Sequence, residues 1–127
     1  MTNEWHTRML ELAHRSTEAE DLEFVRLVEM ATWSCDFETC QTLVRTFVTD
    51  NDYGVQESVV SVLSSAKTED YQRALLEELP RMVADAPEWA EVLVEREVKN
   101  NQAALRKSLA NVSFEARQFF EIFTKSN

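Results

Sequence analysis

The sequence predicts an all-α fold, a right-handed α-solenoid-like stack of about four antiparallel helix pairs that spans residues 1–127 as a single domain. Only one Gly and two Pro occur among the 127 residues, so the sharp turns of hairpins are scarce. Good helix formers such as Ala, Leu, Glu, Gln and Arg fill the long segments. Apolar residues recur at helical spacing in units of 32 or 33 residues, which favours a stack over the alternative, a plain orthogonal bundle.

The first helix pair is expected within residues 3–31. Its first apolar stripe consists of Trp5, Met9, Leu12 and Ala13. Thr17 then caps the second helix, with Glu20 at the position that completes a capping box. The predicted buried face of that helix is Leu22, Val25, Val28 and Ala31, with Leu27 as an alternative to Val28.

The second pair is expected within residues 36–63. Asp36 caps a helix whose apolar stripe is Phe37, Cys40, Leu43, Val44 and Phe47. After a polar run, Asp52 is predicted to cap the fourth helix, which buries Val55, Val59, Val62 and Leu63. Cys35 and Cys40 are five residues apart, a helical offset that does not aim their side chains at each other, so we expect free buried thiols.

The remaining four helices are predicted to start at Thr68, at Asp85 with Pro87, at Asn101 and at Ser113. Pro80 predicts a kink or a short second piece in the fifth helix, because proline lacks a backbone donor and crowds the preceding turn. The apolar positions are Tyr71, Leu75, Leu76, Leu79, Met82 and Val83, then Trp89, Val92, Leu93 and Val98, then Ala104, Leu105 and Leu109, then Phe114, Phe119, Phe120 and Phe123. With Ile122, the last helix has more apolar residues than one stripe holds; we expect them in the core, with a stack cap or a dimer contact as the alternative.

The regular spacing of the pairs is the observation that favours a stack. They begin near Asn3, Asp36, Glu69 and Asn101, which are 33, 33 and 32 residues apart. Helix-pair repeats of about 30–47 residues are typical of α-solenoids. Short connections make consecutive helices antiparallel.

The charge and the amino-terminal residues limit the classes of partner. A formal net charge of −10 argues against direct binding to nucleic acid or to an anionic membrane. It suits either plain solubility or a basic protein partner. The first residues lack the basic start and apolar run of a secretory signal, and no stretch reaches the roughly 18 apolar residues of a membrane span. We therefore expect a cytoplasmic protein.

The sequence shows no recognisable catalytic or cofactor-binding pattern, so we expect no enzyme, no cofactor and no metal. His6 and His14 are eight residues apart, too far to ligate one metal as an i, i+4 pair does. The patterns of nucleophile elbows, redox cysteine pairs, zinc proteases and phosphate loops are absent from the sequence. Glu77 and Glu78 are adjacent, hence about 100° apart on a helix, and are interpreted as solvated.

Acidic residues supply the candidate partner-binding sites. Glu88, Glu91 and Glu95 lie three and four residues apart on one ridge of the sixth helix, with Trp89 beside them. Like charges at this spacing destabilise a helix by about 0.2–0.5 kcal/mol per pair, so the ridge favours an interface with a basic partner over an ordinary solvated face. The second candidate group is Asp50, Asp52, Tyr53 and Glu57. The third is Glu18, Glu20, Asp21 and Glu23, which the helix dipole already explains. In a regular stack the three groups would form one acidic strip.

The stretch from Asp52 to Leu63 resembles the second helix of a HEAT repeat. Its pattern is Asp-x-x-Val-x-x-x-Val-x-x-Val-Leu, with an Asp cap and small apolar residues on the inner side. Gln56 stands where such repeats usually have a basic residue. The proline at Pro80 is similar to that of the kinked first helix of these repeats. This resemblance implies a fold and carries no activity.

As a whole, the short, acidic and helical chain resembles the immunity proteins that bacteria encode beside contact-dependent growth-inhibition toxins. Several of those inhibitors are small helical repeats. The resemblance implies that the chain binds and neutralises a cognate toxin carboxy-terminal domain in the cytosol, as a 1:1 complex. That domain is expected to be basic and an RNase or DNase. The resemblance transfers the role and no contact positions. The alternative is a HEAT-like scaffold or adaptor protein with no catalytic role.

Overall fold

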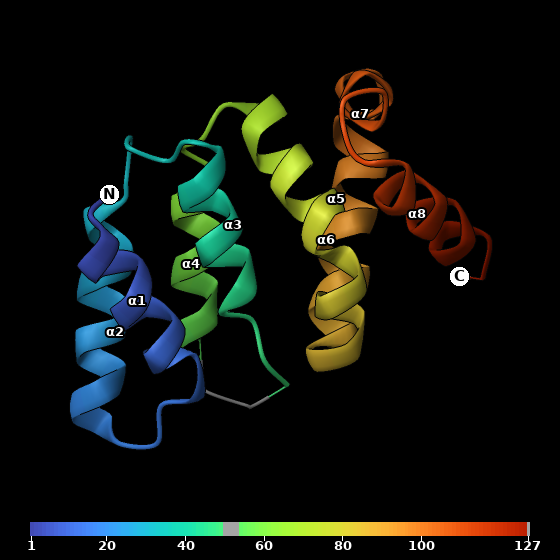
Figure 1. Ribbon diagram of the computed structural model, residues 1–127. Helices are drawn as coiled ribbons and strands as arrows, with labels where there is room; N and C mark the ends of the chain where they lie inside the picture. Colours follow the sequence, from blue (N-terminus) through green and yellow to red (C-terminus); the bar gives the residue numbers. More distant parts are fainter. Residues whose placement is uncertain (50–53, 127) are drawn as a thin grey trace.

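The computed structural model describes residues 1–49 and 54–126, and within these ranges it holds eight α-helices, one 3-10 turn and no strand (Figure 1). The all-α prediction is confirmed. In chain order the elements are α1 (Asn3–Glu11), η1 (Leu12–His14), α2 (Glu18–Met30), α3 (Phe37–Arg45), α4 (Val55–Leu63), α5 (Thr68–Asp85), α6 (Pro87–Asn100), α7 (Gln102–Leu109) and α8 (Phe114–Ser126).

The first helices of successive pairs lie against one another, with α1 against α3, α3 against α5 and α5 against α7. Among the second helices, α2 lies against α4. Figure 1 shows the pairs following one another from left to right, with α8 at the right-hand end. The main partner of α8 is α5, whereas a regular stack would place it on α6. The solenoid-like order is therefore interrupted at the last pair and is not confirmed.

The amino-terminal helices form as the apolar spacing predicts. Trp5, Met9, Leu12 and Ala13 are all buried. The indole of Trp5 also donates a 2.8 Å hydrogen bond to the backbone oxygen of Leu27, which joins α1 to α2. At the start of α2, the hydroxyl of Thr17 accepts from the backbone N–H of Glu20 at 3.1 Å. The Glu20 carboxylate in turn accepts a hydrogen bond from the backbone N–H of Ser16, one residue earlier than in a standard capping box.

The predicted buried face of α2 is partly wrong. Val28 and Ala31 are buried as expected, but Leu22 is 68% exposed and Phe24 takes its place in the core. Two helical stripes share Val28, one with Leu22 and Val25 and one with Phe24. The second stripe prevails because a phenyl ring removes more apolar surface from water than an isobutyl group does.

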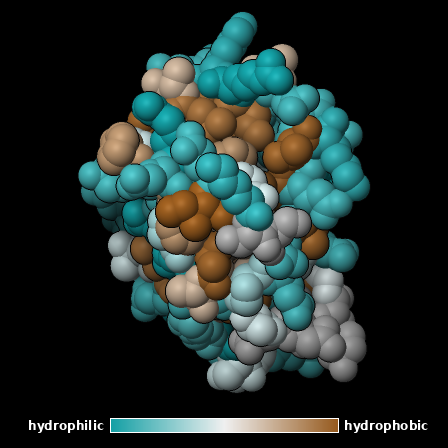
Figure 2. All heavy atoms as spheres, turned by 90° about the vertical axis from the view of Figure 1, so that its right-hand side faces the viewer, coloured by the Kyte–Doolittle hydropathy of each residue, from teal (hydrophilic) through white to brown (hydrophobic). Residues whose placement is uncertain are grey.

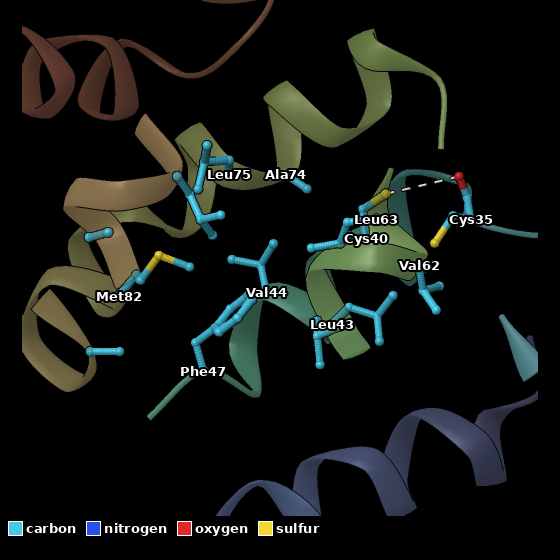
Figure 3. Packing of buried hydrophobic residues seen from close by; sticks show 14 of the residues in the cluster. Cys35, Cys40, Leu43, Val44, Phe47, Val62, Leu63, Ala74, Leu75 and Met82 are labelled. Atoms are coloured by element: carbon cyan, nitrogen blue, oxygen red, sulfur yellow. Dashed lines mark hydrogen bonds between the residues drawn. The ribbon is translucent and has the colours of Figure 1, made fainter. Parts of the chain in front are cut away.

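The central helices α3 and α4 supply much of the core in Figure 3, which shows Cys40, Leu43, Val44 and Phe47 lying among the side chains of α4 and α5. Asp36 caps α3 as predicted, since its carboxylate accepts from the backbone N–H of Thr39 at 2.9 Å. Cys35 and Cys40 are buried free thiols, and the Cys40 sulfur lies 3.9 Å from the backbone oxygen of Cys35.

The predicted start of α4 is wrong. The helix begins at Val55, and its N-cap residue is Gly54 in the left-handed conformation, with φ at +98°. Asp52, the predicted cap, lies outside the described residues. Glycine adopts a positive φ without a steric penalty, so the only glycine of the chain fixes the start of the helix. Val59, Val62 and Leu63 are buried as predicted.

Helix α5 runs through Pro80 without a second piece, although Figure 1 shows its axis changing direction along its length. Thr68 is its first helical residue and Lys67 the N-cap, so the predicted cap is one residue late. Asp85 is the last residue of α5 and pairs with Arg81 at 3.3 Å, so its predicted capping of α6 is wrong.

Two of the three remaining helix starts are as expected. Pro87 is the first residue of α6, where its missing N–H costs nothing. Ser113 caps α8, because its hydroxyl accepts from the backbone N–H of Ala116 at 3.1 Å. Asn101 holds the N-cap position of α7, but its side-chain amide donates to Glu97 instead of capping.

Candidate protein-binding surface

Helix α6 carries the predicted carboxylates on its solvent side. Glu88, Glu91 and Glu95 are all exposed, and we call these three residues the acidic ridge. Glu95 forms an i, i+4 ion pair with Lys99, at 2.7 Å between the carboxylate oxygen and Nζ. This hydrogen bond lowers the pKa of Glu95 and raises the pKa of Lys99. Lys99 therefore offsets part of the charge at the carboxyl end of the ridge.

Trp89 lies beside the acidic ridge in the sequence but points toward the core. Its ring packs on the ring of Phe47 with 4.9 Å between the centroids and a 38° tilt. The side chain is half-buried, so only part of its surface is open to a partner. Trp89 thus holds α6 against the segment that follows α3, and its predicted role in binding stays a prediction.

Exposed apolar side chains lie next to the acidic ridge. Val92 is 47% exposed and Val98 37% exposed, so the prediction that they are buried is wrong. The buried face of α6 consists of Ala90, Leu93, Val94 and Glu97. Val92 and Val98 are turned to solvent because they lie off this buried stripe of the helix.

An open groove of about 550 Å³ separates α6 from the end of α8. Its lining is Glu91, Val94, Glu95, Val98, Lys99, Phe123 and Thr124. Figure 2 shows this side of the molecule, where hydrophobic residues gather in patches bordered by hydrophilic ones. On α8 itself, Phe114 and Ile122 are exposed while Phe120 is buried, so the last helix is only partly core.

The other two acidic groups differ from the ridge. Asp50, Asp52 and Tyr53 lie outside the described residues, and Glu57 is exposed in the first turn of α4. The acidic residues of α2 mostly bond to groups of the same chain. The continuous strip across the three helices stays a prediction.

On α2, Glu23 makes a two-pronged contact with Arg8, at 2.8 Å to Nε and 2.6 Å to an Nη atom. This bond lowers the pKa of Glu23. Asp21 accepts from Nε of Arg15 at 2.8 Å. Bonds from the Ser16 backbone and the Thr17 hydroxyl lower the pKa of Glu20. The carboxylates of α2 thus join it to α1 and to the turn before it.

Sequence reasoning missed the long-range roles of two carboxylates on α5. Glu78 is buried and accepts a 2.7 Å hydrogen bond from Nε of Arg45, which joins α5 to α3. Glu77 accepts from the backbone N–H of Ser113 at 2.6 Å, which joins α5 to the start of α8. The interpretation of Glu78 as solvated is wrong because its side chain is buried, whereas Glu77 is half-buried and its bond to Ser113 lies at the surface.

A buried polar cluster joins α5, α6 and α7. Oε1 of Glu97 accepts from Nε2 of Gln72 at 2.9 Å and from Nδ2 of Asn101 at 3.2 Å. Oε1 of Gln72 in turn accepts from the hydroxyl of Ser108 at 2.7 Å. One sequence signal could have found it: Glu97 follows Leu93 by four residues, on the apolar stripe of α6, where an acidic residue requires polar partners.

Trp33 is a second residue that the sequence did not single out. It lies in the turn after α2, is 83% exposed and has a φ of +64°. Its backbone N–H donates to the hydroxyl of Ser65 at 3.0 Å. A tryptophan in the left-handed region carries backbone strain that glycine would not.

The described residues give little support to a metal site or a membrane-spanning segment. Nδ1 of His6 lies 2.6 Å from the hydroxyl of Thr42, a contact between α1 and α3. Within residues 1–49 and 54–126, no three His, Cys, Asp or Glu side chains gather in a metal-binding arrangement. Over the same residues, no helix has the length and apolar character needed to cross a membrane.

Comparisons of the chain with protein-family models, with curated proteins and with solved structures found no match in any of the three.

Proposed function

We propose that this chain is a cytoplasmic immunity protein that binds a basic toxin domain through α6 and blocks it. The resemblance to the inhibitors of contact-dependent growth-inhibition toxins supports the role. The surface of α6 supports the chemistry of recognition. In this proposal the partner is a nuclease domain, an RNase or DNase, bound in a 1:1 complex.

The observation that carries the proposal is the acidic ridge beside exposed Val92 and Val98. Protein interfaces combine an apolar centre with a polar and charged rim. Like charges three and four residues apart weaken a helix, so selection for stability alone would remove them. Lysines or arginines of a partner would convert that repulsion into attraction.

A nuclease is a suitable target for such a surface. It holds nucleic acid largely through Lys and Arg contacts to phosphates. Inhibitor carboxylates that pair with those Lys and Arg side chains therefore compete directly with the nucleic-acid substrate. Complementary charge also speeds association and makes it sensitive to salt, which suits an inhibitor that must act before its toxin does.

The test is co-purification with the protein encoded immediately upstream, followed by measurement of affinity by calorimetry. Replacement of the whole acidic ridge, Glu88→Lys, Glu91→Lys and Glu95→Lys, is expected to weaken binding by at least about a hundredfold. The matched control is Glu4→Lys, Glu29→Lys and Glu69→Lys, three exposed acidic residues elsewhere with the same change in net charge.

The control triple variant should keep most of the affinity, because long-range charge alone does not fix an interface. Equal affinity of the ridge variant and the wild type would overturn the role of α6. An upstream protein that does not bind at all would overturn the immunity function and favour the alternative, a HEAT-like scaffold or adaptor.

A further inference from the structure

A second, smaller pocket lies where α4 ends, α5 begins and α6 meets α7. These helix ends lie at the top of the molecule in Figure 1. Its volume is about 230 Å³. It shares no lining residue with the groove between α6 and α8, and it contains none of the acidic ridge. The residues that matter for its chemistry are Val60, Leu63, Tyr71, Arg96, Glu97 and Asn100.

Glu97 is the unusual member of this lining, because it is a carboxylate with only 4% of its surface exposed. Both of its hydrogen bonds, from Gln72 and Asn101, go to Oε1. Oε2 makes no hydrogen bond with any residue that the structure describes, and no described Lys or Arg pairs with it. Oε2 is not among the fully buried polar atoms that lack a partner, so solvent reaches it, and a cationic ligand would find an unpaired carboxylate oxygen there.

Two further groups define what else the ligand must carry. Arg96, the residue before Glu97 on α6, is exposed to solvent and lines the same pocket. Burial, with a smaller contribution from the charge of Glu97, raises the pKa of the Tyr71 phenol, so its hydroxyl stays a hydrogen-bond donor at neutral pH. The charged residues of the described lining are therefore one anion and one cation.

We propose that this pocket binds a small zwitterion of the free α-amino acid class. Its ammonium group pairs with Oε2 of Glu97, and its carboxylate pairs with the guanidinium of Arg96. Arg–carboxylate pairs are often two-pronged, which fixes the orientation of the ligand. Val60 and Leu63 offer an apolar wall to a short side chain.

The two charges act as a filter. A simple amine would meet repulsion from Arg96, and a simple carboxylate would meet repulsion from Glu97. A ligand that carries both groups avoids both penalties. The volume is below the range of about 300–1,000 Å³ usual for drug-sized ligands, which suits a molecule with few heavy atoms. This inference goes beyond the proposed immunity function and does not depend on it.

The experiment is titration of the full chain with each free amino acid at neutral pH, followed by NMR chemical shifts of the pocket residues and by calorimetry. Methylammonium and acetate are the single-charge probes. At least one amino acid is expected to bind with a Kd below about 10 mM, and each single-charge probe about tenfold more weakly. Absence of any amino-acid binding would overturn the proposal, and so would equal binding of methylammonium.

Three variants locate the site. Glu97→Gln keeps the shape and the acceptor Oε1, and Arg96→Gln changes an exposed side chain; each is expected to weaken binding by about tenfold or more. Glu115→Gln, an exposed carboxylate on α8 outside both the pocket and the acidic ridge, is the control and should leave the affinity unchanged. Unchanged affinity in a folded Glu97→Gln variant overturns the proposal. If circular dichroism shows that this variant does not fold, Arg96→Gln decides, and unchanged affinity there overturns it.

Discussion

Helices α2 and α6 are each the second helix of a pair and each carries a series of acidic residues, yet they use their carboxylates differently. On α2, Glu20, Asp21 and Glu23 bond to groups of the same chain. On α6, the one ion pair of the ridge among the described residues joins Glu95 to Lys99. The number of acidic residues on each helix does not explain this difference. The difference is whether a basic or N–H group of the same chain lies within hydrogen-bond distance of the carboxylates. The carboxylates of α2 therefore stabilise the fold, and α6 is the better candidate for a partner-binding surface.

The largest expected effect concerns the buried side of α2. Phe24→Ala should lower the free energy of unfolding by about 3–5 kcal/mol, because it leaves a cavity under a fully buried ring. Urea denaturation measures this loss. Leu22→Ala, two residues earlier and largely exposed, is the control and should change stability by less than about 0.5 kcal/mol. Equal losses from the two variants would show that the face of α2 is assigned wrongly.

The next prediction compares the carboxylates themselves. Glu23→Gln should lower stability at neutral pH, whereas Glu91→Gln should leave it equal or raise it slightly by removing repulsion along the ridge. The bond from Arg8 places the folded-state pKa of Glu23 below its unfolded value. Its stabilisation is therefore fully present above the unfolded pKa and is lost as the pH falls through the folded pKa.

Denaturation curves at a series of pH values check this difference. The gap in free energy between the wild type and Glu23→Gln should close as the solution becomes acidic. A gap that stays constant from neutral to acidic pH would mean that the Arg8–Glu23 contact contributes no charge-dependent stability.

The smallest expected effect is at the turn that follows α2. Trp33→Gly should raise the free energy of unfolding by about 0.5–1 kcal/mol, because glycine adopts a positive φ without strain. Trp33→Ala keeps the strained backbone and serves as the control, with thermal unfolding as the measurement. If α6 is the interface, neither variant should weaken binding of the upstream protein; a large loss of affinity in both would move the interface to this turn.

Sequence patterns were reliable where one local bond decides the outcome. The caps at Thr17, Asp36 and Ser113 were predictable because the acceptor and the N–H that it satisfies are three residues apart. The start of α4 was not, since Gly54 sets it through its backbone conformation. At Asp85 the same acidic residue that could cap α6 ends α5 instead.

The candidate site was less predictable than the fold. Spacing correctly placed Glu88, Glu91 and Glu95 on one exposed ridge. It could not show that Glu78 and Glu97 are buried, because their partners Arg45 and Gln72 are 33 and 25 residues away in the sequence. Pairings over such distances arise from the packing of helices and leave no local pattern.

The central position of α5 has a consequence for how this chain could change in evolution. Repeat proteins whose units touch only their neighbours can gain or lose a unit and still fold. Here α5 contacts α3, α6, α7 and α8, and Gln72 depends on Ser108 for one of its bonds. Deleting the last pair would uncover one side of α5 and leave a buried amide without its partner. The chain is therefore expected to unfold in a single cooperative step and not to tolerate the loss of its last pair.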